Sequence, residues 1–491
     1  MEDRNSYLKS ERSQEWREEL RKKIKAKDRT DVPRVKMNEV DASERVQSYI
    51  EVNSGLTQEQ AQKEATRCVD CANPTCITGC PVEINIPKFI KRIEQGEFLE
   101  AAKVLKETST LPAVCGRVCP QEKQCEANCF YTQKLKKEPV AIGYLERFAA
   151  DYERESGQIS IPEIKEKNGR KVACIGSGPA GLTFAGEMAK KGYDVTVFEA
   201  LHEIGGVLKY GIPEFRLPNN IVDVEIESLK KMGVQFETNF IVGKTASIED
   251  LKEEGFEAFF TGSGAGLPRF MNIPGENYIG ILSSNEYLTR INLMHAADQT
   301  TDTPVVSGNK VMVVGGGNTA MDSVRTAKRL GAERAMIVYR RSMEEMPARL
   351  EEIEHAKEEG VEFMTLANPI EYFANEKGQV NQVKVQKMEL GEPDASGRRR
   401  PIPVEGSEEL IEVDTVVVSV GVSPNPIVPD SLPELKTTSW GTIQVNEETL
   451  QSSMPEMFAG GDIVRGGATV ILAMGDGRKA AQKMDEYLKN K

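Results

Sequence analysis

The sequence predicts an α/β fold in which a small helical domain precedes two domains built on parallel sheets. Three observations support this prediction. Eight of the nine cysteines fall between Cys68 and Cys129, in a region of helical periodicity. From Lys171, a strand, a glycine loop, a helix and a second strand follow one another, and the same order returns from Lys310. Such βαβ order is typical of a parallel sheet.

The length and composition are those of a globular protein with several domains. The 491 residues make up about three domains of the usual size, and a hydrophobic share of 39% excludes a disordered or collagen-like chain. The net charge of -13 argues against nucleic acid as the main partner. The longest apolar runs, such as VVVSVGV at 416–422, are too short to span a bilayer. We therefore expect a cytoplasmic protein with no membrane partner.

Residues 1–35 form a charged N-terminal segment. Acidic and basic groups alternate there with few apolar residues (ERSQEWREELRKKIKAKDR), so we expect a solvated helix or a tail. Thr57 is a candidate N-cap before a run of helix formers that leads to Cys68, and helical patterns return beside both groups of cysteines. Residues 36–160 are therefore predicted to be a helical domain organised by its cysteines.

The clustered cysteines form two groups of four. The first is Cys68-x2-Cys71-x4-Cys76-x3-Cys80-Pro81 and the second is Cys115-x3-Cys119-Pro120-x4-Cys125-x3-Cys129. Disulfides are uncommon in a cytosolic chain, and zinc usually takes paired C-x2-C knuckles, of which the sequence has one. A cysteine followed by proline after a cysteine run is typical of bacterial ferredoxin. Iron–sulfur ligation is therefore favoured, with zinc and structural thiols as the alternatives, and Cys174 is interpreted as a core residue.

The first glycine loop, GSGPAG, fits a phosphate-binding turn. Its candidate dinucleotide-binding residues are Gly176, Gly178, Pro179, Ala180 and Gly181. Gly176 permits the tight turn, Gly178 lets the backbone approach a pyrophosphate, and Gly181 allows close packing of helix on strand. The helix that follows offers free N–H groups to the phosphates. Glu199 ends the next strand, where its carboxylate can accept hydrogen bonds from ribose hydroxyls. The alternative is a glycine turn in a Rossmann-like fold that binds no nucleotide.

The second glycine loop, GGGNTA, favours a different ligand. Its candidate residues are Gly315, Gly317, Asn318, Thr319 and Ala320. The strand that would end in an acid ends instead in Tyr339, Arg340 and Arg341. Guanidinium groups suit a 2′-phosphate, and no acid remains to accept the ribose 2′-OH, so NADPH is favoured over NADH. The alternative is that the two arginines only cap a surface strand.

A third glycine turn lies near the C-terminus, in MFAGGDIVRGGATVILAMGDGRKAA. This segment resembles the one with which glutathione reductase-like flavoproteins, which bind two dinucleotides, complete their FAD site. The resemblance implies that Gly461 and Asp462 would hold the ribityl or pyrophosphate region of FAD. It also implies that the helix starting near Thr469 would point its positive end at the flavin N1/O2 edge and stabilise the reduced flavin.

The same resemblance implies a discontinuous FAD-binding domain, residues 161–290 and 426–491, around an NADPH-binding domain at residues 291–425. The redox disulfide of the C-x4-C type that such reductases carry after the first module is absent. The segment LHEIGGVLKYGIPEFR takes its place and contributes the candidate FAD-binding residues Gly206, Leu208 and Arg216. Electrons must then leave by another route. The predicted fold class is therefore α/β, with two Rossmann-like dinucleotide-binding domains of the glutathione reductase type, for FAD and NADPH, after an α-helical iron–sulfur domain.

Seven motifs, taken in order, resemble one family. They are CVDCANPTCITGCPVEINIPKFI, CGRVCPQEKQCEANC, GSGPAG, YGIPEFR, GGGNTAMD, VYRR and AGGDIVRGGATVILAMGDGRKAA. This order resembles the small (beta) subunit family of NADPH-dependent glutamate synthase. The same architecture recurs in the large subunit of electron-bifurcating NADH-dependent ferredoxin:NADP oxidoreductase and in the N-terminal half of dihydropyrimidine dehydrogenase. The similarity covers about residues 36–491.

The resemblance implies two 4Fe–4S clusters with interleaved ligands. One cluster would be held by Cys68, Cys71, Cys76 and Cys129, and the other by Cys80, Cys119, Cys125 and Glu146. Cys115 would be the spare thiol, and it is also the alternative to Glu146.

The resemblance further implies that NADPH reduces FAD and that single electrons leave through the clusters, with no catalytic acid or base. The first candidate function is the small subunit of glutamate synthase, which delivers electrons to an FMN-containing large subunit. The second is a subunit of ferredoxin:NADP oxidoreductase, with that enzyme's small subunit as its partner. A redox sensor or scaffold without turnover is the third, and the intact glycine loops, arginine pair and cysteines argue against it.

Overall fold

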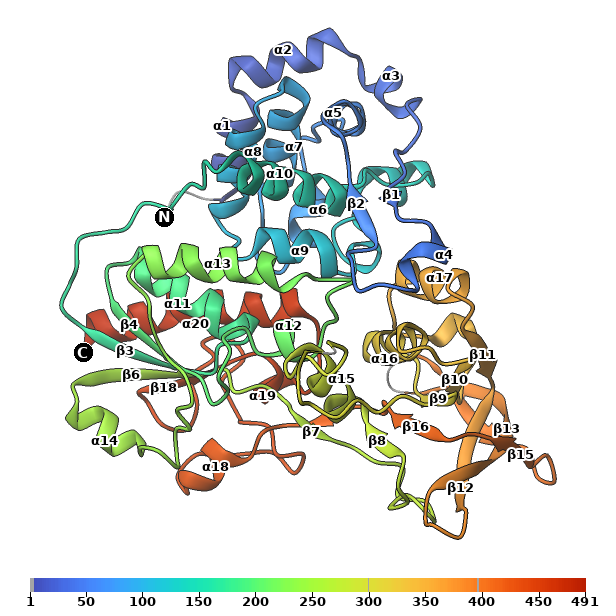
Figure 1. Cartoon of the computed structure of the whole chain (residues 1–491). Coiled ribbons are helices and arrows are strands. Elements are labelled where there is room, and N and C mark those ends of the chain that lie inside the picture. Colours follow the sequence, from blue (N-terminus) through green and yellow to red (C-terminus); the bar gives the residue numbers. More distant parts are fainter. Residues whose placement is uncertain (1–3, 299, 395–396) are drawn as a thin grey trace.

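The fold is taken from a computed structural model that describes residues 4–298, 300–394 and 397–491. Figure 1 shows a helical N-terminal domain above two α/β domains that lie side by side. Each α/β domain contains a five-stranded parallel sheet. The N-terminal domain consists of helices and one short antiparallel ribbon. These features confirm the predicted fold class.

The N-terminal domain packs its helices around an apolar core. Its elements are α1 (Arg4–Arg12), α2 (Glu15–Lys23), α3 (Ala26–Thr30), β1 (Asn38–Glu39), α4 (Ala42–Arg45), β2 (Asn53–Gly55), α5 (Gln58–Thr66), α6 (Thr75–Thr78), α7 (Ile86–Gln95), α8 (Phe98–Lys106), α9 (Pro112–Val118) and α10 (Ile142–Ser156). Thr57 caps α5 in a capping box with Gln60, as the sequence predicted. Helix α7 buries Phe89 and Ile93 and ends at Gly96 in a left-handed turn.

The first three helices form an arm, residues 4–30, that is docked on this domain. Arg17 and Arg29 are buried, and Leu20 packs beside them. The arm is helical and largely accessible to solvent, but the expectation of a solvated helix or tail does not hold for Arg17, Leu20 and Arg29, which are buried. Its buried arginines find their partners far along the chain, in Asp70 and Glu94. Charge alternation within the arm does not reveal such partners.

The first nucleotide domain is built on the sheet β18-β6-β3-β4-β5. Its elements are β3 (Lys171–Ile175), α11 (Pro179–Lys190), β4 (Asp194–Phe198), α12 (Val207–Tyr210), α13 (Asn219–Lys231), β5 (Gln235–Glu237), α14 (Ile248–Glu253), β6 (Phe256–Thr261), α18 (Ile427–Ser431), β18 (Met457–Ala459), α19 (Asp462–Arg465) and α20 (Val470–Asn490). Strand β18 and helix α20 come from the C-terminal part of the chain, so the domain is discontinuous. Helices α11 and α20 pack closely at Gly477, where an added Cβ would lie 2.2 Å from the carbonyl oxygen of Ala180.

The second nucleotide domain is built on the sheet β11-β10-β9-β16-β8. Its elements are β8 (Ile281–Ser283), α15 (Ser284–Asn292), β9 (Lys310–Val314), α16 (Asn318–Arg329), β10 (Arg334–Tyr339), α17 (Leu350–Glu358), β11 (Glu362–Thr365) and β16 (Thr415–Val418). An antiparallel sheet covers it, formed by β12 (Ala367–Ala374), β13 (Val380–Pro393), β14 (Arg399–Pro403) and β15 (Glu409–Glu412). Because β8 belongs to this parallel sheet, the domain begins before residue 291, where the sequence placed its boundary.

A two-stranded ribbon joins the nucleotide domains. Strand β7 (Leu267–Pro268) pairs antiparallel with β17 (Val422–Ser423). The chain therefore leaves the first domain and returns to it through adjacent segments. Within residues 4–298, 300–394 and 397–491, no helix combines the length and the apolar character that crossing a bilayer requires. The cytoplasmic location stays a prediction.

Buried ion pairs fasten the second nucleotide domain to both of the other domains. We call this set the arginine network; its members are Arg45, Arg216, Asp322, Arg325, Arg329, Glu352 and Glu359. Arg216 of the first nucleotide domain reaches Asp322 on α16 over 2.8 Å and Glu352 on α17 over 3.0 Å. Arg45 of the N-terminal domain reaches Glu359 over 3.0 Å. Removing one partner of a buried pair costs about 3–5 kcal/mol, so these contacts hold the three domains in one arrangement.

Candidate functional site

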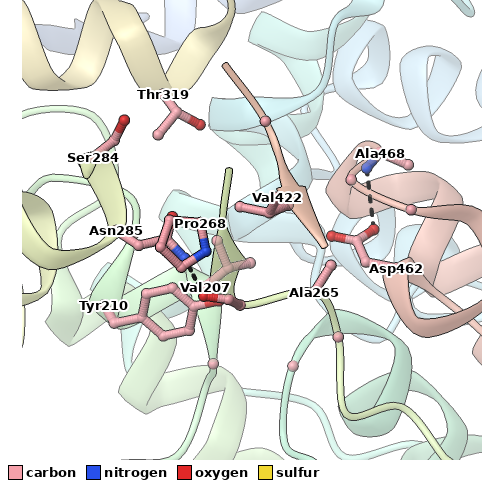
Figure 2. A pocket seen from close by; sticks show the side chains of 18 of the residues that line it. Val207, Tyr210, Ala265, Pro268, Ser284, Asn285, Thr319, Val422, Asp462 and Ala468 are labelled. Carbon is pink, nitrogen blue, oxygen red and sulfur yellow. Dashed lines mark hydrogen bonds between the residues drawn. The ribbon is translucent and has the colours of Figure 1, made fainter. Parts of the chain in front are cut away.

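One cavity of about 2070 Å³ extends from the first glycine loop to the second. Pockets for single small ligands usually measure about 300–1,000 Å³, so this cavity has room for more than one such ligand. In Figure 2, Asp462 and Ala468 lie on one side, and Thr319 lies on the other. Val422 of the connecting ribbon lies between them, and Pro268 of the same ribbon also lines the cavity. The cavity therefore passes the junction of the two nucleotide domains.

Most residues predicted for the first dinucleotide line this cavity. They are Gly176, Gly178, Pro179, Ala180, Glu199, Gly206, Arg216, Gly461, Asp462 and Thr469. Leu208 lies instead in the core with its side chain fully buried. Gly181 serves packing, because an added Cβ would lie 1.9 Å from the carbonyl oxygen of Gly176. Arg216 lines the cavity, but its guanidinium is taken up by Asp322 and Glu352 of the arginine network.

The first glycine loop leaves space for a phosphate. An added Cβ at Gly178 would meet no atom within 4 Å, and α11 starts at Pro179 with no side chain capping it. The first N–H groups of a helix lack partners inside the helix, so this end suits an anion. Glu199 is held by its neighbours: Oε2 accepts from the N–H of Ser177 over 2.9 Å, and Oε1 accepts from Leu201 over 2.8 Å. Ser177 lies inside the GSGPAG motif but was not among the predicted site residues.

Asp462 is the acidic group at the C-terminal side of the cavity. Its Oδ1 accepts from the N–H of Ala468 over 3.2 Å. Burial, followed by the nearby charge of Asp476, raises the pKa of Asp462 to about 6. Asp476 also accepts from the N–H of Gly461 over 2.9 Å and thereby holds the turn. Helix α20 begins beside it, at the predicted position, and Thr469 caps it. The other carboxylate oxygen of Asp462 can accept a hydrogen bond from a hydroxyl group of a polyol chain. The N-terminus of α20 can stabilise negative charge on a ring next to that chain.

The second glycine loop lines the other end of the cavity. The predicted residues found there are Gly315, Gly317, Asn318, Thr319, Arg340 and Arg341. Ala320 lies in the core. The two arginines differ. Arg340 is exposed and forms no ion pair or hydrogen bond with the residues that the structure describes. Arg341 is buried and donates to Asp394 over 2.6 Å and to the carbonyl of Arg399 over 2.8 Å. Arg340 is therefore the arginine that can meet a phosphate, and Arg341 tethers the end of strand β13.

The structure brings together the first set of proposed iron–sulfur ligands. We call Cys68, Cys71, Cys76 and Cys129 the first set. Desolvation raises the pKa of Cys76 well above its usual value, and the nearby thiols of Cys68, Cys129 and Cys71 raise it further. Desolvation also raises the pKa of Cys71 to about 12, again with Cys68 and Cys129 as neighbours. Cys129 therefore joins three cysteines that lie more than fifty positions earlier.

The second set is Cys80, Cys119, Cys125 and Glu146. Burial raises the pKa of Cys80 to about 12, and Glu146 and Cys119 contribute. The Oε1 of Glu146 is buried without a hydrogen-bond partner among the described residues. This oxygen is therefore available to act as a ligand to iron. Cys115 lies beside this set, and its Sγ lies 3.4 Å from the sulfur of Met474.

A zinc site with four thiolate ligands would bring its sulfur atoms close together. Four thiolates around one zinc ion, each about 2.3 Å from it, lie about 3.8 Å apart. Among the described residues, the only group of three or more metal-ligating atoms mutually within 4.8 Å is Glu39, Glu351 and His355. None of the described cysteines belongs to such a compact group of three or more ligand atoms. The trio itself is occupied by other contacts, because Glu39 and Glu351 pair with Arg45 and Arg349.

The two sets lie at different depths. Val118 and Pro120, next to Cys119, line the cavity. The second set is buried, whereas Cys68, Cys71 and Cys76 of the first set are partly exposed. The order from inside to outside is therefore the cavity, the second set, the first set and solvent.

Comparison with known families gives two matches. A family profile described as dihydropyrimidine dehydrogenase domain II, 4Fe-4S cluster, matches residues 45–158. A profile described as pyridine nucleotide-disulphide oxidoreductase matches residues 170–477. The two matches follow the boundary between the N-terminal domain and the nucleotide domains.

Similar proteins cover most of the chain. The chain is 38% identical over 456 residues to the glutamate synthase [NADPH] small chain of Azospirillum brasilense, covering 92% of this chain and 94% of that one. It is 39% identical over 437 residues to the NADP(+)-dependent formate dehydrogenase subunit beta of Moorella thermoacetica, covering 84% of this chain and 60% of that one. A solved structure of FprA from Mycobacterium tuberculosis in complex with NADPH has a TM-score of 0.54 at 20% identity, covering 65% of this chain and 85% of that one. The last likeness shows the fold alone.

Proposed function

The chain belongs to the pyridine nucleotide-disulphide oxidoreductase family, in the group that contains the small chains of NADPH-dependent glutamate synthase, and from this we propose that it passes electrons from NADPH to a larger partner. It is an NADPH-dependent iron–sulfur flavoprotein oxidoreductase with FAD and 4Fe–4S clusters. The family resemblance inferred from the sequence motifs is confirmed. The partner and the individual site residues remain proposals.

The residues of the first nucleotide domain would hold FAD. The free N–H groups of α11 and the open backbone at Gly178 would bind the pyrophosphate, and Glu199 would accept from the adenosine ribose. Asp462 would accept from a ribityl hydroxyl, and the N-terminus of α20 would face the flavin ring. FAD supplies the change from two-electron to one-electron chemistry.

The residues of the second nucleotide domain would orient NADPH. The N-terminus of α16, beside Gly317 and Thr319, would bind the pyrophosphate, and Arg340 would bind the 2′-phosphate. No side chain has to act as an acid or base, because hydride transfer requires orientation and exclusion of water. The connecting ribbon, with Pro268 and Val422, would border the place where the two rings meet.

The observation that carries this proposal is the single cavity shared by both glycine loops, with a buried thiol set beside it. Electrons would leave through the second set and then through the first set. The segment 72–79 contains Cys76 of the first set, carries no charged residue, and has only Ile77 buried among its members. A partner could approach the first set there without displacing charged side chains.

The proposed partner is an FMN-containing glutamate synthase large subunit. The similarity to small chains over more than nine-tenths of both chains supports this choice. The second candidate partner is the small subunit of a ferredoxin:NADP oxidoreductase. The likeness to a formate dehydrogenase subunit beta supports the broader point that this architecture occurs with different partners. Flavin typing of the native complex separates the candidates: FMN in the partner favours glutamate synthase, and FAD with a 2Fe–2S centre favours the second.

The isolated chain is expected to oxidise NADPH with ferricyanide or a tetrazolium dye and to form no glutamate from glutamine and 2-oxoglutarate. The described elements are used up by the iron–sulfur domain and the two nucleotide domains, so none remains for a synthase or amidotransferase domain. Dye reduction and glutamate are measured separately, before and after addition of a glutamate synthase large subunit. Glutamate from the chain alone would disprove the need for a partner, and no dye reduction by flavin-replete protein would favour the scaffold.

Replacing Arg340 with alanine is expected to raise the KM for NADPH by ten- to a hundredfold and to leave the KM for NADH nearly unchanged. A charge-assisted contact to the 2′-phosphate contributes on the order of 1.5–3 kcal/mol, which corresponds to this range. Steady-state kinetics with both nucleotides measures the effect. Arg334→Ala is the matched control, because Arg334 begins the same strand but pairs with Glu362 on the surface. An equal increase in KM for both nucleotides would show that Arg340 does not bind the 2′-phosphate.

A further inference from the structure

A buried aspartate lies between the first two cysteines of the first set. Asp70 is fully buried, and its φ of 52° places it in the left-handed region that residues other than glycine rarely adopt. Cys68 and Cys71 flank it in the sequence, so the turn at Asp70 sets the direction of both thiols. A buried carboxylate without partners is strongly destabilising. The shape of this ligand loop therefore depends on the groups that hold Asp70.

Three arginines of the arm hold Asp70. We call Arg12, Arg17 and Arg21 the arginine clamp. The Nε of Arg12 donates to the carbonyl oxygen of Asp70 over 2.8 Å. Arg17 binds the carboxylate at Oδ1, and Arg21 binds it at Oδ2 over 2.5 Å. Arg21 also donates to the carbonyl of Arg12 over 2.9 Å, which ties α1 to α2. Every oxygen of Asp70 is thus held by the arm.

The clamp also places positive charge beside the first set. Two guanidinium groups bind the carboxylate of Asp70 and a third binds its carbonyl oxygen, so three positive charges surround one negative charge. The ammonium of Lys91 donates to the carbonyl of Cys68, and Glu94 balances it over 2.5 Å. A cluster held by thiolates carries negative charge, and net charge and hydrogen bonding nearby set its reduction potential. Excess positive charge at this position favours the reduced cluster.

The arm has anchors that do not involve the clamp. Arg29 donates to the carbonyl of Thr66 over 2.7 Å and pairs with Glu94 over 2.9 Å. Glu11 pairs with Lys88 over 2.9 Å. These contacts hold α1 and α3 on the domain, so the arm is expected to stay docked when the clamp is removed.

We propose that the arm is a positioning element for the cluster of the first set: the arginine clamp, acting through Asp70, fixes Cys68 and Cys71 and raises the reduction potential of that cluster. This inference rests on the proposed function, because it assumes that the first set holds a cluster. The clamp arginines are positioning residues, since they act through Asp70. The arm lies outside the matched iron–sulfur profile, which begins at residue 45, so the family match does not assign it this role.

The test compares the full-length holoprotein with the variant Arg17→Gln/Arg21→Gln. Arg4→Gln is the control on the same arm, because Arg4 pairs with Glu83 at the exposed surface. Iron release to a chelator and electron paramagnetic resonance during redox titration are measured under anaerobic conditions. The double variant is expected to release about half of its iron at least tenfold faster than the control, consistent with one labile cluster of two. The midpoint potential of one cluster should become more negative, and the other cluster and the FAD content should be unchanged.

A conservative variant separates charge from packing. Arg17→Lys/Arg21→Lys keeps both positive charges and is expected to restore the potential of the affected cluster. Unchanged release rates and potentials in the glutamine variant would overturn the positioning role. If the glutamine variant loses both clusters, the lysine variant decides the question. A lysine variant that contains one cluster supports the proposal, and a lysine variant that also lacks both clusters overturns the proposal. Iron analysis of the unmodified protein tests the proposed function separately. Far fewer than about eight iron atoms per chain, four per cluster, would contradict the proposed function before any variant is compared.

Discussion

Replacing Cys125 with serine is expected to remove one cluster and to stop electron transfer to a protein acceptor, while NADPH still bleaches the flavin. Cys125 is buried, with Cys80, Glu146 and Cys119 as its neighbours. Serine offers a hard oxygen in place of the thiolate with which a cysteine binds the iron of a cluster. Because the second set lies between the cavity and the first set, its loss interrupts the only proposed path outward.

Two measurements show this effect. Iron analysis should fall from about eight to about four atoms per chain, and reduction of a one-electron protein acceptor should fall by at least about a hundredfold because the remaining cluster is cut off from the flavin. The rate of flavin bleaching by NADPH in a stopped-flow experiment should stay within about twofold, since hydride transfer takes place between the nucleotides. Undiminished transfer to the acceptor would place the exit path elsewhere.

Cys115→Ser is the matched control for Cys125→Ser. Cys115 is equally buried and lies beside the second set, but it is proposed to be the spare thiol. Its replacement is expected to leave the iron content unchanged. If Cys115→Ser loses iron and Glu146→Gln retains it, Cys115 is the fourth ligand of the second set.

Replacing Gly181 with alanine is expected to give a destabilised protein that is purified without flavin. The added Cβ would lie 1.9 Å from the carbonyl oxygen of Gly176 and 3.1 Å from the sulfur of Cys174. Both neighbours belong to the core of the first βαβ unit, and the backbone oxygen cannot move away without opening the loop. Overpacking of a core costs about 1–3 kcal/mol or more. Flavin absorbance and urea unfolding of the apoprotein measure the two effects.

Gly178→Ala tests the space for the ligand at the first glycine loop without disturbing the packing of the protein core. The backbone of Gly178 is extended, and its added Cβ would meet no protein atom within 4 Å. The free energy of unfolding of the apoprotein should therefore change by less than about 1 kcal/mol. The Cβ would instead point into the space proposed for the pyrophosphate, so the affinity for FAD should fall by at least about tenfold. Unchanged FAD affinity in this variant would show that the pyrophosphate does not bind at the first glycine loop.

Local patterns in the sequence were sufficient for the fold. Hydrophobic periodicity and glycine spacing depend on residues that are neighbours in the chain, so both βαβ units and the helical domain could be predicted. The N-cap Thr57 and the start of a helix near Thr469 were predicted in the same way. The grouping of Cys129 with Cys68 was accessible only through the family resemblance, since spacing alone does not show which thiols meet.

Long-range pairing of charged groups could not be predicted. Arg216 was expected to bind FAD, yet its guanidinium pairs with Asp322 in another domain. The arm was expected to be solvated, yet Arg17 finds a buried partner 53 positions away. The sequence shows charge but not burial, and burial decides whether an arginine binds a ligand, fastens a domain or faces water.

The arginine network has a consequence for the speed of turnover. A swing of the second nucleotide domain would pull Arg216 away from Asp322 and Glu352, and Arg45 away from Glu359, and would leave buried charges without partners. The nicotinamide and flavin sites would therefore keep a constant separation throughout the reaction. Reduction of the flavin should then be insensitive to solvent viscosity, because no large body has to move through the solvent between nucleotide binding and hydride transfer.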